Sequence, residues 1–324
     1  MELQWRAPTD GDLDAWVEAL AAIEAFDRTG EVLGRQDLEE QLGLSYVDRD
    51  RDARLGWCDG TIVAWGVVWS LPSPDQRRVL LDGAVVPSAR GHGVGAQLVE
   101  LQMARGREIA AAGDPASPAW LELSASEADA TRAELFRARG FSPHRYYFEM
   151  RRGLTEVPAV RPAGANIDLQ QFDFAIDEAV RATHNEAFHD HFASSELDAE
   201  TWHLWVTGHH NFRADCSFVA LDGETIVGYA LNSIHPDDWP GLGFKEGWTH
   251  QLGVLRPWRN RGVATALLHA TAAAFAREGL DYAALDVDAD SPTGALALYE
   301  GQGYHRDKTR VAWSFDLPPR SGPD

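Results

Sequence analysis

Two short glycine-containing segments carry the clearest chemical signal in the sequence. The pattern Arg-x-x-Gly-x-Gly/Ala occurs at residues 90–95 and again at residues 259–264, each time between a β-rich run and an apolar helical pattern. Small residues at such a turn let backbone N–H groups approach a ligand, and the helix N-terminus adds unpaired donors with a partial positive charge. Both segments are therefore predicted to bind a pyrophosphate, with Arg90 and Arg259 adding charge-assisted contacts.

The residues expected to line these two sites are the turn itself, the end of the strand before it and the first helical residues after it. In the first segment they are Val85, Val86, Arg90, Gly91, His92, Gly93, Val94 and Gly95. In the second segment they are Leu252, Gly253, Val254, Arg259, Asn260, Arg261, Gly262, Val263 and Ala264. The bland alternative is that the small residues only permit close helix packing.

A dinucleotide site is a competing interpretation, because residues 91–96 also fit the G-x-G-x-x-G/A fingerprint. The motif follows a strand-rich stretch instead of a first strand, and no acidic residue stands at the end of a following strand. The second segment has Asn260 where the first glycine belongs. These features favour the pyrophosphate turn over a nicotinamide enzyme.

The elements around the two turns recur in the same order, which indicates an internal repeat. An Asp-Gly hairpin at residues 58–66 reappears at 221–229, and the strand, turn and helix follow in each half. A further strand and a helix ending at glycine come next, at 119–141 and at 283–304. Each half thus predicts one α/β domain with a mixed central sheet flanked by helices.

The domain boundaries follow from the repeat and from a length near twice the roughly 150 residues of one domain. We expect a first domain at residues 1–152, a linker at 153–165 and a second domain at 166–324. The linker contains Pro158, Pro162 and Gly164 without either apolar period. The tail from Pro318 to Asp324 is predicted to fray.

Composition limits the class of protein. The net charge of −21 argues against nucleic acid as a partner, although it mostly serves solubility. No apolar stretch reaches bilayer length, and residues 1–14 lack the basic and apolar pattern of a signal peptide. The distant Cys58 and Cys216 predict buried thiols in a reducing compartment. We expect a cytoplasmic protein without a membrane partner.

The repeated turn, together with the Leu-Tyr-x-x-x-Gly-Tyr ending at residues 298–304, resembles the GNAT superfamily of N-acetyltransferases. The resemblance covers nearly the whole chain, twice. It implies acetyl-CoA as co-substrate, no metal, and a splayed fourth strand at Gly253, Val254 and Leu255 whose backbone amide polarises the thioester. It also implies that Tyr299 protonates the departing thiolate, where the first copy has Phe136. Tyr299 is alternatively a core residue.

An acceptor amine must lose a proton before it attacks, so a base is expected near the fourth strand. His250 is the first candidate and Glu246 the second, and either residue is alternatively an ordinary polar position on a strand edge. The first copy is expected to be degenerate, with a structural or regulatory role, and the second copy to be catalytic.

The acceptor site, by the same resemblance, is built from the first two helices of the second copy. Its candidate residues are His184, Phe188, His191 and Trp202. A metal site is the sharper alternative for these histidines, but no third ligand stands at a diagnostic spacing. The other alternative is an ordinary solvent-exposed helix without a binding role.

The tandem layout is similar to the mycothiol synthase group, in which the second of two GNAT domains performs the transfer. The shared pieces include residues 150–152, 185–188 and 235–237, whereas residues 248–251 lack the acidic residue of that group. The predicted reaction is acetyl transfer to a primary amine of a small-molecule or peptidic acceptor. A non-catalytic acetyl-CoA sensor or scaffold is the alternative.

Overall fold

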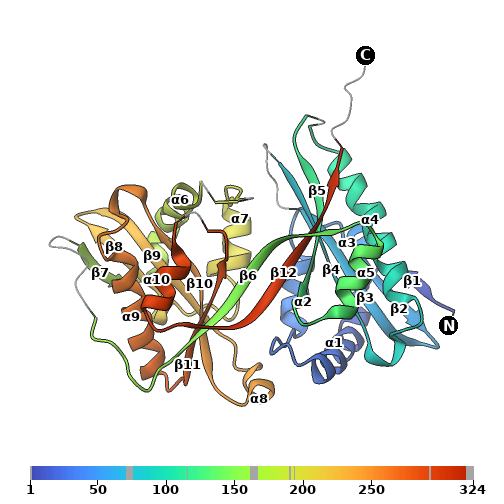
Figure 1. Cartoon of the computed structure of the whole chain (residues 1–324), viewed down its shortest axis with the longest axis horizontal. Coiled ribbons are helices and arrows are strands. Elements are labelled where there is room, and N and C mark those ends of the chain that lie inside the picture. Colours follow the sequence, from blue (N-terminus) through green and yellow to red (C-terminus); the bar gives the residue numbers. More distant parts are fainter. Residues whose placement is uncertain are drawn as a thin grey trace. The chain divides into compact units, whose positions relative to one another are not determined.

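The computed structural model describes residues 2–70, 76–114, 116–160, 167–189, 191–192, 194–291 and 293–318. Residues 161–165 of the predicted linker and residues 319–324 of the predicted tail lie outside this part of the chain. Two compact units form, one from residues 1–146 with 310–324 and the other from 147–309. Figure 1 shows the elements of each unit. Each unit is an α/β fold, as the repeat predicts.

The first unit holds one sheet in the order β1-β2-β3-β4-β5-β12. Its strands are β1 (Gln4–Arg6), β2 (Ala53–Cys58), β3 (Thr61–Ser70), β4 (Arg77–Val85), β5 (Ala119–Ser126) and residues 310–317 of β12 (His305–Leu317). Its helices are α1 (Leu13–Asp27), α2 (Arg35–Leu42), α3 (Arg49–Asp52), α4 (Val94–Ala111) and α5 (Ala130–Ala138). Strands β4 and β5 pair in parallel and the other pairs are antiparallel, so the sheet is mixed.

The second unit repeats this arrangement in the order β6-β11-β10-β9-β8-β7. Its strands are residues 147–153 of β6 (Ser142–Gly153), β7 (Ile167–Gln171), β8 (Phe218–Asp222), β9 (Thr225–Ile234), β10 (Glu246–Val254) and β11 (Tyr282–Asp288). Its helices are α6 (Asp177–Phe188), α7 (Ala199–Trp202), α8 (Trp239–Leu242), α9 (Val263–Arg277) and α10 (Ala295–Gly301). Strands β10 and β11 form its parallel pair.

The last strand of each sheet comes from the other half of the chain. Residues 147–153 of β6 pair antiparallel with β11 of the second unit, while residues 310–317 of β12 pair antiparallel with β5 of the first. The compact units therefore differ from the expected boundaries at 152 and 166. The predicted linker also begins inside the second unit, because Leu154 is buried and donates its N–H to the Asp281 carbonyl at 2.9 Å.

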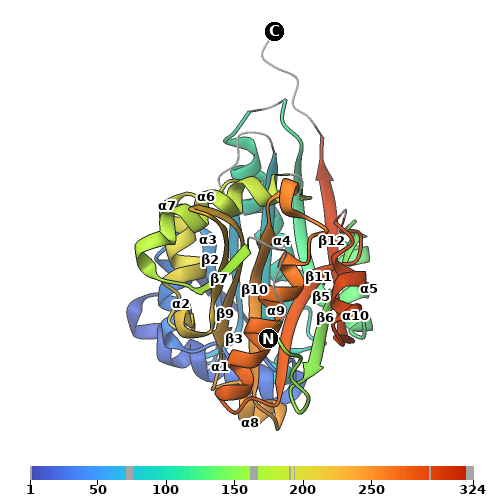
Figure 2. The same ribbon diagram turned by 90° about the vertical axis from the view of Figure 1, so that its left-hand side faces the viewer.

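The helices of the second unit cover opposite faces of its sheet. A side chain added at Gly228 on β9 would meet Val263 of α9, whereas the next residue, Tyr229, contacts His184 of α6. Figure 2 shows α6 and α7 on one side of this sheet and α9 on the other. Helix α6 buries Val180, His184 and Ala187 toward the strands, a spacing that places them on one helical face.

The structure bears on the expectations for the two cysteines and for membrane-spanning segments. The thiol of Cys216 is buried, as predicted, but Cys58 is only half-buried because it ends β2 beside the Asp-Gly turn. Across the described residues, no helix combines the length and apolar character that crossing a bilayer requires.

Candidate active site

Strand β10 separates from its parallel neighbour halfway along its length. Pairing with β11 runs from Glu246–Tyr282 to Thr249–Leu285, whereas β10 stays paired with β9 as far as Val254. The register with β9 shifts between Thr249 and Gln251, so His250 is the extra residue of a bulge. The edge of β10 that faces β11 therefore offers backbone groups at Leu252–Val254 to an extended ligand.

The glycine turn follows this open edge and leads into α9. Gly262 caps the helix with a φ of 81°, and Asn260 takes the left-handed region with a φ of 60°. Gly91 and Gly93 of the first unit have φ values of 77° and 80°. Asn260 thus adopts the conformation of the glycine it replaces, which asparagine tolerates better than most residues. The turn, with a helix N-terminus behind it, fits a pyrophosphate.

The two motif arginines form hydrogen bonds within the protein. Arg259 donates from Nε to the Val254 carbonyl at 3.0 Å and from Nη2 to the Ala187 carbonyl at 2.9 Å. Arg90 donates from Nε to the Val85 carbonyl at 2.9 Å, and Asp27 takes its other two nitrogens at 2.6 and 2.8 Å. These bonds brace the turn, and the expected contacts of the two guanidinium groups with a pyrophosphate stay a prediction.

The two candidate bases on β10 have different surroundings. Glu246 is buried and accepts hydrogen bonds from Arg151 Nε at 2.5 Å, Arg151 Nη2 at 3.2 Å and Trp248 Nε1 at 3.0 Å. Its lone pairs are committed to structural partners, which favours His250 as the base.

His250 belongs to a group of polar side chains on β9 and β10. Its Nε2 lies 3.3 Å from Nε2 of His235, which in turn lies 2.8 Å from the hydroxyl of Ser233. Packing around the ring, and then His235 and His209, lower the pKa of His250. The residue as a whole is solvent-exposed. The ring is neutral at pH 7 and can accept a proton.

Tyr299 lies on α10 and is almost completely buried, with its ring 6.0 Å from that of Tyr304. Burial raises the pKa of Tyr299 to about 12. The hydroxyl therefore stays protonated at neutral pH and can act as a proton donor. Its ring is at the same time part of the core, so the two interpretations of this tyrosine are compatible.

The expected acceptor residues form a packed aromatic cluster. The ring of His184 stacks on that of Phe188 with centroids 4.5 Å apart, and the ring centroids of Phe188 and His191 are 4.3 Å apart. Trp202 is fully enclosed and donates its indole N–H to Asp177 at 2.6 Å. The structure brings the four residues together, but Trp202 occupies the core and His184 is bonded to Tyr229 at 2.7 Å. Phe188 and His191 lie at the outer side of the cluster.

Burial makes His184 a source of pH-dependent stability. Desolvation, and then His191, lower the pKa of His184 from 6.5 to about 4. The unfolded chain thus binds the proton more readily, so stability present above pH 6.5 is lost as the pH falls toward 4. Between pH 7 and pH 5 this histidine is expected to remove about 2 kcal/mol of unfolding free energy. Urea unfolding at both pH values should show that His184→Gln loses less stability than the wild type, and an equal loss would contradict the assignment.

Known proteins are most clearly similar to this chain in the part that carries the candidate site. Residues 178–304 match the model of the Acetyltransferase (GNAT) family, which spans α6, the bulged strand, the glycine turn and Tyr299. The second unit is thus similar to GNAT-type N-acetyltransferases. The GNAT family generally uses acetyl-CoA.

Relatives of similar length support this assignment. The chain is 26% identical to a mycothiol acetyltransferase of Nocardia farcinica, over 96% of this chain and 97% of the relative. It is also 26% identical to a mycothiol acetyltransferase of Corynebacterium aurimucosum, over 95% and 96% of the two chains.

Solved structures share the fold. A GCN5-related N-acetyltransferase from Sphaerobacter thermophilus superposes with a TM-score of 0.74 at 24% identity, over 99% of this chain and 97% of that one. A tandem GNAT protein from the clavulanic acid biosynthesis pathway superposes with a TM-score of 0.70 at 15% identity, over 99% and 100%. The tandem arrangement of two GNAT folds is therefore shared over the full length.

The first GNAT-like unit keeps the turn but differs along its fourth strand. Its parallel pairing stops at Leu80–Glu122 while β4 continues to Val85, so the strands also splay. However, β3 and β4 pair without a register shift from Ala64–Val85 to Ser70–Val79, so this unit has no counterpart of the His250 bulge. Phe136 is buried against Phe141 and Trp313. The chemistry-bearing groups are thus concentrated in the second unit.

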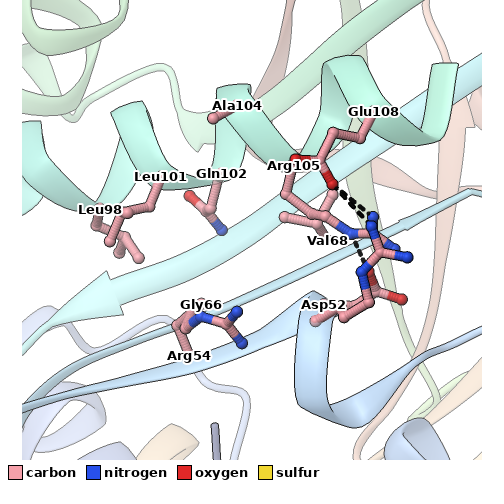
Figure 3. A pocket seen from close by; sticks show the side chains of 11 residues that line it. Asp52, Arg54, Gly66, Val68, Leu98, Leu101, Gln102, Ala104, Arg105 and Glu108 are labelled. Carbon is pink, nitrogen blue, oxygen red and sulfur yellow. Dashed lines mark hydrogen bonds and ion pairs between the residues drawn. The ribbon is translucent and has the colours of Figure 1, made fainter. Parts of the chain in front are cut away.

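The first unit also contains a cavity of about 300 Å³, shown in Figure 3. It lies beside the middle of α4, and none of the turn residues lines it. Arg105 donates to Asp52 at 2.6 Å and to Glu108 at 2.8 Å, and Arg51 donates to Glu108 at 3.0 Å. These charges largely compensate one another, and the cavity is separate from the GNAT turn.

Three polar residues on or next to β9 were not among the sequence candidates. Tyr229 and Ser233 belong to β9 and His235 follows it, each an even number of residues from the others, and such positions share one face of a strand. Their even spacing was visible in the sequence, although Leu231 interrupts the series of polar residues. What the sequence did not show was that the bulge turns His250 toward that face.

Proposed function

We propose that the protein transfers the acetyl group of acetyl-CoA to a primary amine of a small-molecule or peptidic acceptor in the cytoplasm, with the second unit performing the reaction. The observation that carries this proposal is the coincidence, in that unit, of a splayed and bulged β10, the glycine turn, a neutral His250 and a protonated Tyr299. The curated relatives named mycothiol acetyltransferases favour a small-molecule acceptor.

In the proposed reaction the amine passes a proton to His250 and its nitrogen attacks the thioester carbon. The new C–N bond forms as the carbonyl electrons move to oxygen, which a backbone N–H of β10 stabilises. Collapse of this intermediate breaks the C–S bond, and the thiolate takes the proton of Tyr299. The amide nitrogen then gives up its extra proton, which restores the Tyr299 hydroxyl, and His250 releases its proton to water. Release of CoA thiol upon addition of amines, followed with a thiol reagent, tests the proposal. No release with any member of a broad amine panel would contradict it.

For the first unit we propose binding of acetyl-CoA without turnover, with a structural or regulatory role. Its turn has the same left-handed residues and its strands splay, which supports binding. Phe136 has no proton to donate. Strand β4 has no bulge that would present a basic residue as His250 is presented on β10, and both differences argue against catalysis. Gly93→Val should therefore leave most of the turnover intact, and complete loss of turnover in a folded variant would contradict this division.

Acetyl-CoA binding by the second unit is expected to depend on Gly262. Its φ of 81° is unfavourable for a β-branched side chain by roughly 1–3 kcal/mol. A side chain there would also stand at the mouth of the turn. Calorimetric titration of Gly262→Val in a Gly93→Val background should give an affinity for acetyl-CoA at least about tenfold weaker than the background alone. Equal affinity in the two proteins would remove the turn from the binding site.

A further inference from the structure

A buried pair of polar side chains lies beneath the open part of β10. The hydroxyl of Tyr229 is 2.7 Å from Nδ1 of His184, and both residues are almost fully enclosed. Burying two polar groups is unfavourable unless they bond each other. The pair is therefore satisfied, but an apolar pair would fill the same place without that requirement.

The first unit has a pair of tryptophans at the corresponding position. Tyr229 lies opposite Gly253 on β10, and Trp65 lies opposite Ala84 on β4. These positions correspond because the next residues, Val254 and Val85, accept the Nε–H of the two motif arginines. Trp65 packs against Trp16 of α1 with centroids 5.7 Å apart. The fold thus stands without a tyrosine and a histidine here, so their presence needs another reason.

The Tyr229 hydroxyl lies at the strand segment expected to hold the thioester. A side chain at Gly253 would overlap this hydroxyl, so the tyrosine lies directly across the glycine. At Gly253 the β10 edge has already lost its partner β11. Burial, and then Tyr299, raise the pKa of Tyr229, so its hydroxyl keeps its proton at neutral pH. The Tyr229 hydroxyl comes from β9 and that of Tyr299 from α10.

We propose that Tyr229 is a second catalytic tyrosine, which donates a hydrogen bond to the thioester oxygen, and that His184 is its positioning residue. The inference rests on the proposed function, because it needs the acyl group at β10. A hydroxyl shielded from bulk water is a strong donor to a developing oxyanion. Tyr229 would act together with the β10 backbone N–H, while Tyr299 keeps its separate task at sulfur.

The proposal requires one tautomer of His184. Desolvation holds the imidazole neutral, so one ring nitrogen carries a proton. If that nitrogen is Nδ1, the ring donates to the phenol oxygen and leaves the phenol proton for the substrate. If it is Nε2, the phenol proton is used by Nδ1 instead. Nitrogen NMR of the histidine rings in the full chain should find His184 protonated at Nδ1, and protonation at Nε2 would overturn the proposal.

Variants of the pair separate catalysis from packing. Tyr229→Phe should lower kcat at least about tenfold with little change in KM for acetyl-CoA, since the lost bond forms mainly in the transition state. His184→Asn keeps a donor near Nδ1 and should retain most activity, whereas His184→Phe should match Tyr229→Phe. Tyr304→Phe is the matched control, because Tyr304 is equally buried and its hydroxyl has no partner among the described residues.

A binding comparison makes failure of this inference distinguishable from failure of the proposed function. S-ethyl-CoA lacks the thioester oxygen, so the preference for acetyl-CoA over this analogue should fall about threefold in Tyr229→Phe. Gly93→Val serves as background so that only the second unit is measured. Absence of any acetyl-CoA binding would overturn the proposed function and this inference together. Normal binding and turnover with an unchanged preference and kcat in Tyr229→Phe would overturn this inference alone.

Discussion

Replacing Arg151 by methionine is expected to destabilise the second unit by about 3–5 kcal/mol. Arg151 reaches Glu246, Glu149 and Asp307, and only 11% of its side chain is exposed. Without it, the Glu246 carboxylate, with 4% of its side chain exposed, would remain buried and keep only the Trp248 bond. Urea unfolding of the full chain, followed by tryptophan fluorescence, measures the loss.

The control for this prediction is Arg213→Met. Arg213 bonds Asp215 and Glu278, but those carboxylates are 54% and 40% exposed and water can replace the arginine. This substitution should lower the free energy of unfolding by no more than about 1 kcal/mol. Adding Glu246→Leu to Arg151→Met should recover much of the loss, because it deletes the stranded charge. Similar losses for the two arginine variants would show that burial of Glu246 is not the cause.

The largest effect on turnover is expected for Tyr299→Phe, at about 10²-fold in kcat. The thiol is a tolerable leaving group even without its proton, so the effect stays at the lower end for a general acid. Phenylalanine keeps the ring and its packing against Tyr304, so folding should change little. The KM for acetyl-CoA should stay nearly constant because the bond is made mainly in the transition state.

Steady-state kinetics with a saturating amine, after a check of thermal unfolding, tests this expectation. Phe136→Tyr in the first unit provides the converse control and should leave kcat unchanged, since that unit has no bulged base. Full activity in a folded Tyr299→Phe protein would reduce the tyrosine to core packing. It would also remove the contrast with Phe136 as an argument for one catalytic unit.

Sequence reasoning found the features that depend on neighbouring residues. The left-handed turn at Gly262 and the start of α9 follow from local chemistry, and the repeat located both copies. It could not find the partner of Glu246, because Arg151 is 95 residues away in the chain. Nor could it show that Arg259 would bond the Val254 and Ala187 carbonyls, since a turn motif does not specify where a long side chain points.

The residues expected to bind the acceptor also show that a sequence pattern does not specify where a side chain points. Histidine and aromatic residues on α6 and α7 suit a binding site by composition, but the structure encloses Trp202 and pairs His184 with a strand residue. Whether such residues face a ligand or the core depends on how the helix is turned on the sheet. Hydrophobic periodicity gives that orientation only approximately, because His184 itself lies on the buried face.

The exchanged strands give the chain an order of assembly during its synthesis. Strand β5 pairs with β4, but it receives its second partner only when residues 310–317 have been synthesised, after the whole of the second unit. Until then the first unit presents an unpaired strand edge, which is a site for wrong pairing. The second unit, by contrast, already has the β6 residues it needs before its own sequence begins. A gene cut at the linker would therefore yield two fragments, each carrying the strand that belongs to the other.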